Sequence, residues 1–151
     1  MNSSEAFHIR EVLQCLVRDF GLLQREGSQC CGITVMQSQI LYEMGKHDNL
    51  SLNELSAKLS MDSGLLSRQI NNLVDTGYVN RIPDPKDRRY VILSLSEQGK
   101  KKRDEISEQM VEYVNGIFNR IPKDKHEQVV ESLQLLADAM KGDFNSSCCS
   151  T

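Results

Sequence analysis

Apolar residues recur at spacings of three and four along the first part of the chain, which is the period of one face of an α-helix. The pattern predicts a long amphipathic helix from Glu5 to about Gln24, broken by the glycine- and cysteine-containing segment 27–32. Its apolar positions are Ile9, Val12, Leu13, Leu16, Phe20 and Leu23. A second helix is expected to follow, with Thr34 as its N-cap and its end near Gly45.

Two shorter helices are predicted next, separated by a tight turn at residues 60–62. The first opens at Ser51, where Glu54 three residues later completes a capping box. The second begins at Asp62 or Ser63 and ends before Gly77, a residue type that suits the position after a helix. The apolar faces expected to pack together are Leu52, Leu55 and Leu59 on the first helix and Leu66, Ile70, Leu73 and Val74 on the second.

The remaining pattern predicts a hairpin and two further helices. Two strands are expected at Tyr78–Ile82 and Tyr90–Leu95, joined by a turn-rich, charged segment. A long helix should run from residues 96–99 to about Arg120, and a last one follows Pro122 and carries Val129, Leu133, Leu136 and Met140. The order describes a winged helix-turn-helix, mainly α with a small β-hairpin wing.

The outer helices predict a second copy of the chain. At 151 residues the chain fits one domain, with residues 48–100 as the winged helix-turn-helix lobe. That lobe alone would leave the apolar stripes of 5–47 and 104–141 uncovered. We therefore expect these segments to be dimerisation helices of a homodimer. Residues 142–151 are expected to be a flexible tail.

Charge is unevenly distributed along the chain. The formal net charge is −3, which on its own argues against a nucleic-acid partner. Residues 63–103, however, carry nine Lys and Arg against four Asp and Glu, a net +5 inside an otherwise acidic chain. Concentrated positive charge of this kind is typical of phosphate binding, and it indicates double-stranded DNA as the partner.

Candidate DNA contacts fall on two elements. The first half of the second short helix offers hydroxyl, guanidinium and amide groups for phosphates and base edges in a major groove. These residues are Ser63, Ser67, Arg68 and Asn71. The loop from Asp84 to Arg89 is expected to form the wing, with its basic side chains against a neighbouring minor groove or its phosphates.

The wing and its flanks resemble the MarR family of transcriptional regulators. The family motif Asp-x-Arg-Asp-x-Arg, followed by a strand and Leu-Ser/Thr-x-x-Gly, corresponds here to Asp84-Pro85-Lys86-Asp87-Arg88-Arg89 and, after the strand, Leu95-Ser96-Glu97-Gln98-Gly99. Lys86 replaces the usual arginine, which keeps the charge and loses a bidentate contact. Segments 53–56 and 73–79 also look like the family's helix pair, and the resemblance covers roughly residues 5–141.

The resemblance carries several expectations. It implies a dimer on a pseudo-palindromic operator, released by an effector. Because the family contains mostly repressors and a few activators, we expect a repressor, and the sequence does not decide between the two. The resemblance also implies that Asp87 orients Arg89, which enters the minor groove, with Ser67 and Arg68 in the major groove. Lys86 and Arg88 complete the wing contacts.

Cysteines are the candidate sensor. No signal peptide and no apolar run of about 18 residues is visible, so we expect a cytoplasmic protein, without a membrane partner, whose thiols are reduced. The five are Cys15, Cys30, Cys31, Cys148 and Cys149. A disulfide between adjacent cysteines is strained, whereas soft thiolates suit As(III), Hg(II) or Cu(I). Cys30 and Cys31, joined by Cys15 or by the tail pair, are the predicted site of such an effector, and no resident cofactor is required.

Other interpretations remain open at this point. The cysteines are also consistent with core or spacer positions, or with oxidant or electrophile sensing through a crosslink to the partner chain. A phenolic ligand between the helices is a further alternative, and zinc is disfavoured because His8, His47 and His126 are scattered. An enzyme is not expected, since no histidine accompanies a cysteine. A winged protein-interaction module would lack salt-dependent DNA affinity.

Overall fold

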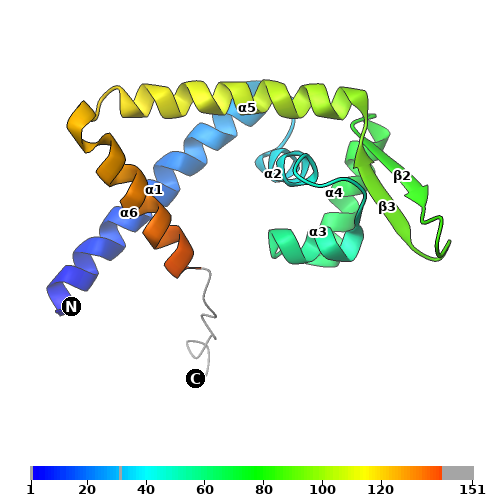
Figure 1. The fold of residues 1–151 in the computed structure, drawn as a ribbon, viewed down its shortest axis with the longest axis horizontal. Coiled ribbons are helices and arrows are strands. Elements are labelled where there is room, and N and C mark those ends of the chain that lie inside the picture. Colours follow the sequence, from blue (N-terminus) through cyan, green and yellow to red (C-terminus); the bar gives the residue numbers. More distant parts are fainter. Residues whose placement is uncertain (1, 31, 141–151) are drawn as a thin grey trace. The chain divides into compact units, whose positions relative to one another are not determined.

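The computed structural model describes residues 2–30 and 32–140, without the side chains of residues 26–30. The chain divides into two compact units, Met1–Val111 and Glu112–Thr151. The elements in chain order are α1 (Ser3–Cys30), α2 (Val35–Met44), β1 (Leu50–Ser51), α3 (Leu52–Leu59), α4 (Ser63–Asp75), β2 (Val79–Pro83), β3 (Val91–Leu95), α5 (Glu97–Phe118), the single 3₁₀ turn η1 (Lys123–Lys125) and α6 (His126–Ala139) (Figure 1). The predicted mainly α fold with a small β-hairpin wing is confirmed.

Two helices begin at capping boxes, of which the sequence predicts the one at Ser51 in full and only the N-cap residue Thr34 of the other. Before α2, the Thr34 hydroxyl accepts from the Gln37 N–H at 3.2 Å while the Gln37 side chain accepts from the Thr34 N–H at 3.0 Å. Before α3, Ser51 and Glu54 make the same reciprocal pair at 3.2 and 2.8 Å. The Ser51 backbone N–H, followed by its side chain, holds the pKa of Glu54 below its usual value. Both boxes satisfy N–H groups that a helix start leaves without partners.

The first helix is longer than predicted. The expected end near Gln24 is wrong, because α1 continues past Gly27 to Cys30. A glycine inside a helix costs only about 1 kcal/mol relative to alanine, which is too little to end a helix of this length by itself. The direction of the chain changes instead at Gly32, whose φ of 71° lies in the left-handed region.

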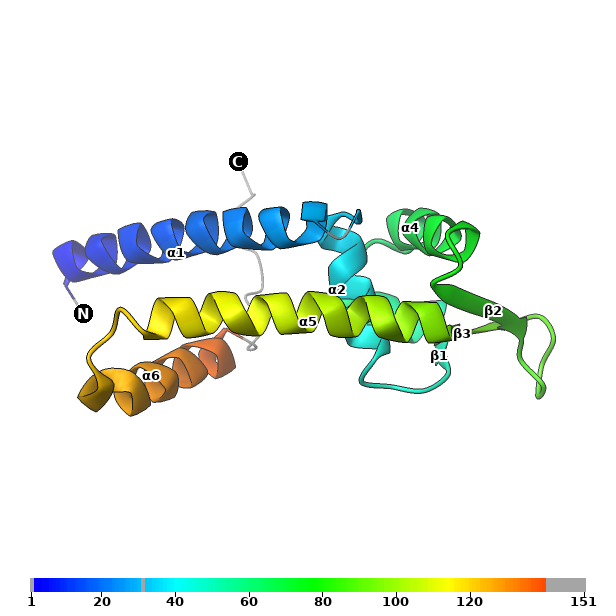
Figure 2. The ribbon, with the colours of Figure 1, turned by 90° about the horizontal axis from the view of Figure 1, so that it is seen from above.

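A three-stranded antiparallel sheet supports the wing, in the order β1-β3-β2. Leu50 lies opposite Leu93, and the β2–β3 ladder runs from Val79 opposite Leu95 to Pro83 opposite Val91. Strand β1 escapes sequence prediction because two residues are too few for an alternating pattern. Figure 2 shows β2, β3 and their connecting loop extending away from α4.

The fully buried part of the core of the first unit is built from side chains of three helices and one strand. These side chains are Ile40, Leu41, Leu55, Leu66, Ile70, Leu73 and Leu93, from α2, α3, α4 and β3. The predicted packing of α4 on α3 is therefore confirmed, with Leu52, Leu59 and Val74 partly buried at the edge of the cluster. Because α4 buries one face completely, its opposite face is fixed toward solvent.

The end of α4 and the start of α5 are bonded to each other. After α4, Gly77 at φ 80° closes a Schellman motif in which its N–H donates to Val74 O at 2.9 Å and the Tyr78 N–H donates to Leu73 O at 2.8 Å. Ser96 then precedes α5: its hydroxyl donates to Gly77 O at 2.5 Å and accepts from the Gly99 N–H at 3.0 Å. The junction ties the base of the hairpin to both helices.

The second unit has a histidine at its turn. His126 Nε2 lies 2.9 Å from Phe118 O and 3.0 Å from Ile121 O, and its ring meets Phe118 edge to face. These contacts hold the end of α5 against the start of α6. Along α6, Val130, Leu133 and Leu135 are exposed in the single chain.

Candidate nucleic-acid interface

Helix α4 presents a polar face that starts at its first turn. Asp62 is the N-cap, and its carboxylate accepts from the Leu65 N–H at 3.0 Å. Ser63, Arg68 and Asn71 are exposed and Ser67 is half-buried, on the side of α4 away from the core. The four residues predicted for the major groove therefore share one helix face, as a recognition helix requires.

The turn between α3 and α4 is held by a serine pair. Ser60 adopts a left-handed φ of 48° after α3, and the Ser56 hydroxyl donates to Met61 O at 2.6 Å. The same hydroxyl lies 3.3 Å from that of Ser63. Ser63 thus joins the first turn of α4 to α3, in addition to facing solvent.

The wing loop is shaped by two aspartates that act in the same way. Asp84 Oδ1 accepts from the Lys86 N–H at 2.8 Å, and Asp87 Oδ1 accepts from the Arg89 N–H at 3.1 Å. Each is an Asx turn, in which the aspartate carboxylate accepts a hydrogen bond from the backbone N–H of the residue two positions later and so takes the place of a backbone carbonyl. The loop is closed by Asp84 N–H to Tyr90 O at 2.9 Å and Tyr90 N–H to Asp87 O at 3.0 Å.

Asp87 and Arg89 form a bidentate ion pair at the wing. Arg89 Nη2 lies 2.7 Å from Asp87 Oδ2 and Nε lies 3.0 Å from Oδ1, while the arginine side chain remains 85% exposed. The Arg89 guanidinium, and then its backbone N–H, hold the pKa of Asp87 below its usual value, and Asp87 raises the pKa of Arg89. The carboxylate limits where the guanidinium can point and leaves its outer edge open to a ligand. This is the contact that the resemblance implied.

Arg81 is a basic residue of the lobe that sequence reasoning missed. It lies in β2, and its Nη1 donates to Asn71 Oδ1 of α4 at 2.9 Å. The other wing cations, Lys86 and Arg88, are exposed in the loop. The strand position was visible in the sequence, but its proximity to α4 depends on tertiary packing.

The cysteine prediction needs one correction. Cys15 is an exposed free thiol on α1, with Arg18 Nη2 at 3.8 Å from its sulfur. Because α1 is continuous to Cys30, the separation of fifteen residue steps between the two corresponds to about 22 Å of helix rise. Cys15 therefore cannot share an ion with Cys30 of its own chain. The Cys30 side chain, Cys31, Cys148 and Cys149 lie outside the described residues, so thiophile binding by those pairs stays a prediction.

Among the described residues, no group of three or more His, Cys, Asp or Glu side chains is placed to hold a metal ion. Within the same residues, no helix combines the length and the apolar character that spanning a membrane requires.

Comparisons with known proteins agree with this geometry. Residues 32–89 match the model of the MarR family. The chain is 26% identical over 118 residues to the HTH-type transcriptional regulator BilQ of Clostridium symbiosum, covering 78% of this chain and 82% of that protein. It is 36% identical over 67 residues to the multiple antibiotic resistance protein MarR of Escherichia coli, covering 44% and 46%.

Solved structures extend the likeness over most of the chain. A MarR transcriptional regulator from Methanosarcina mazei superposes with a TM-score of 0.76 at 27% identity, covering 87% of this chain and 95% of that one. A mutant of E. coli MarR complexed with operator DNA shares the fold, with a TM-score of 0.73 at 22% identity over 87% and 95%. Regulators of this family bind DNA and are not enzymes. The family match to residues 32–89, the named relatives and the shared fold together support a MarR-family transcriptional regulator.

Proposed function

We propose that the protein is a homodimeric repressor that binds a pseudo-palindromic DNA site, with α4 in a major groove and the wing against the neighbouring minor groove. The observation that carries this proposal is the fixed outward face of α4. At most 1% of the surface of Leu66, Ile70 and Leu73 is exposed. Because this face of α4 is buried, Arg68 and Asn71 on the other side are held toward solvent. The basic wing is joined directly to this helix through the Arg81–Asn71 bond.

Repression is the action that this arrangement performs most simply. A dimer that occupies two adjacent major grooves excludes other proteins from the same DNA without further contacts. The major-groove contacts proposed for Ser63, Ser67, Arg68 and Asn71 would carry sequence preference, because base edges are distinguishable there. The wing residues Lys86, Arg88 and Arg89 would supply affinity through phosphates and the minor groove.

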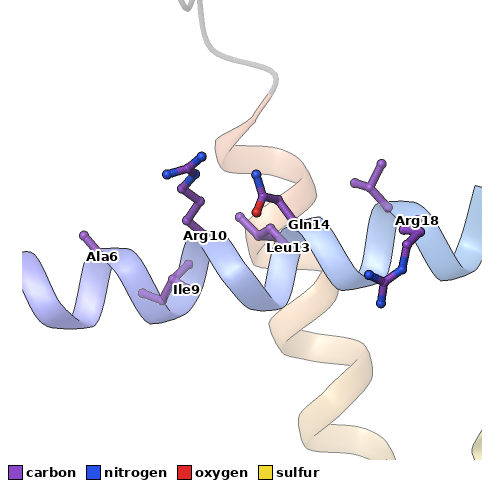
Figure 3. A pocket seen from close by; sticks show the side chains of 7 residues that line it. Ala6, Ile9, Arg10, Leu13, Gln14 and Arg18 are labelled. Atoms are coloured by element: carbon purple, nitrogen blue, oxygen red, sulfur yellow. The ribbon is translucent and has the colours of Figure 1, made fainter.

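An exposed apolar stripe on α1 supports a second copy as the partner. Ile9, Val12, Leu16 and Phe20 are each between 44% and 49% exposed in the single chain. Ala6, Ile9, Leu13 and Val17 line a hollow of about 480 Å³, edged by Arg10, Gln14 and Arg18 (Figure 3). A stripe that spans several helical turns is larger than the scattered apolar residues of a monomer surface. The exposed apolar residues of α6 provide a separate stripe in the second unit.

Light scattering after size exclusion should give twice the 17.1 kDa chain mass at micromolar concentration. Leu16→Glu should shift the protein toward monomer, because it places a charge in the middle of the stripe. Arg25→Glu introduces the same residue nine positions along, half a turn away on the helix, and should leave the dimer intact. A wild-type monomer would contradict the dimeric part of the proposal.

DNA binding itself should be strong and steeply dependent on salt. We expect duplexes selected from a random-sequence pool to bind with an affinity that falls about 1000-fold between 50 and 200 mM salt, as for proteins that contact several phosphates. Fluorescence anisotropy of labelled duplexes measures both affinity and slope. A protein-interaction module would select no sequence and show no such slope, and that result would contradict the proposal.

A further inference from the structure

The bond between Arg81 and Asn71 fixes the orientation of a side chain on the recognition face. Arg81 Nη1 lies 2.9 Å from Asn71 Oδ1, across ten residues of sequence. A guanidinium can only donate hydrogen bonds, so the atom it meets must be the carbonyl oxygen of the amide. The amide orientation of Asn71 is therefore set by chemistry, with its NH₂ group directed away from Arg81.

The β2–β3 register explains how Arg81 reaches α4. Arg81 is paired with Leu93, which is 2% exposed, and two residues before it lies Val79, which is 3% exposed. Side chains at positions 79 and 81 share one face of the hairpin, the face that packs on the helices. Val79 is buried in the core, whereas Arg81, two residues further along the same face, is exposed at the edge of the core beside α4.

The occupied oxygen changes what Asn71 can recognise. An unconstrained asparagine binds adenine with both ends of its amide, accepting from N6 and donating to N7. Here a second donor would have to approach Oδ1 beside a positively charged guanidinium, whereas the two N–H groups of Nδ2 stay available. The amide therefore presents donors in preference to its acceptor.

We infer that Arg81 is a specificity-determining residue that makes Asn71 a hydrogen-bond donor, so that the base pair facing Asn71 is read through guanine O6/N7 or thymine O4 instead of adenine. This inference rests on the proposed function, since it requires α4 in the major groove. Arg81 does not need to touch the base itself: it acts as a positioning residue through the amide that it holds.

Base preference after selection from a random DNA pool tests the inference. Asn71→Ala should flatten the preference at one position of each half-site, which identifies the base pair that faces Asn71. Arg81→Met removes the donor and the charge and should move the preference at that same position to adenine, by about tenfold relative to wild type. In the Asn71→Ala background, Arg81→Met should change no base preference.

A wing arginine supplies the matched control. Arg88→Met removes the same charge from an exposed residue of the wing loop and should lower affinity for all sequences without moving the preference at the Asn71 position. Thermal unfolding of each variant near the wild-type midpoint shows that the lobe is folded. If Arg81→Met only weakens binding uniformly, as Arg88→Met does, or if Asn71→Ala flattens no position, the inference is overturned while the proposed function stands. Wild-type protein that selects no sequence would overturn both.

Discussion

Gly99→Ala is expected to destabilise the folded protein by about 3 kcal/mol, the upper range for overpacking a closely packed site. A Cβ at this position would overlap Tyr78 O and lie 2.9 Å from Tyr78 C. Both atoms belong to the backbone, so no side-chain rotation can relieve the contact. The first turn of α5 would have to move away from the base of the hairpin.

The surrounding hydrogen bonds prevent that movement from being small. Tyr78 O accepts from the Ser96 N–H at 3.0 Å, and the Tyr78 N–H is held by Leu73 O in the Schellman motif. Ser96 in turn bridges Gly77 O and the Gly99 N–H. Separating α5 from Tyr78 therefore breaks several bonds at once, and each lost bond adds about 1 kcal/mol.

Urea unfolding followed by circular dichroism, at one fixed protein concentration, measures the effect. Gly116→Ala is the matched control, because it makes the same change in the same helix where a Cβ would have no neighbour within 4 Å. That variant should gain about 0.5 to 1 kcal/mol, since alanine is the better helix former. Equal stability of the two variants would show that the close approach to Tyr78 is not a constraint in solution.

Gly99 also shows what the sequence could and could not predict about the fold. Helix starts at Thr34, Ser51 and Asp62 depend on side chains within three residues, so the local pattern predicts them correctly. Strand β1 and the end of α1 depend on tertiary context, and both were missed or misplaced. The glycine itself was noted only as part of a family motif, because its reason lies in a contact with residue 78.

At the candidate DNA interface, too, some features could be expected from the sequence and others depend on tertiary packing. The exposed face of α4 follows from its helical period, and the Asp87–Arg89 pair was implied by the family resemblance, so both were expected before the structure. The Arg81–Asn71 bond joins residues ten apart on a strand and a helix, and no local pattern indicates it. Sharing of an ion between Cys15 and Cys30 of the same chain is excluded for the converse reason, since α1 continues unbroken from one residue to the other.

Arg89→Ala should cost about 1–3 kcal/mol of DNA-binding free energy and should reduce the salt slope by about one phosphate equivalent. The guanidinium is 85% exposed at the wing, so its loss leaves no cavity and the unfolding midpoint should change little. Anisotropy titrations at several salt concentrations measure both quantities. Lys123→Ala removes one charge outside the winged lobe and should leave the affinity and the slope close to wild type. An unchanged affinity for Arg89→Ala would remove the wing arginine from the interface.

Asp87→Asn tests whether Asp87 acts by orienting Arg89 or only by its negative charge. The two roles predict changes in DNA affinity of opposite sign. If the wing acted only by net charge, removing a carboxylate near phosphates would strengthen binding. If Asp87 holds Arg89 in position for the groove, the same change weakens binding although the protein becomes more positive, and this is the result we expect.

The sign of the pH effect follows from the same ion pair. Since Arg89 lowers the pKa of Asp87 below the ordinary value of 3.8, the pair is ionised at neutral pH and is lost only as the pH falls through that lowered value. Wild-type binding should therefore keep the contribution of this pair down to about pH 4, and Asp87→Asn should lack it at every pH.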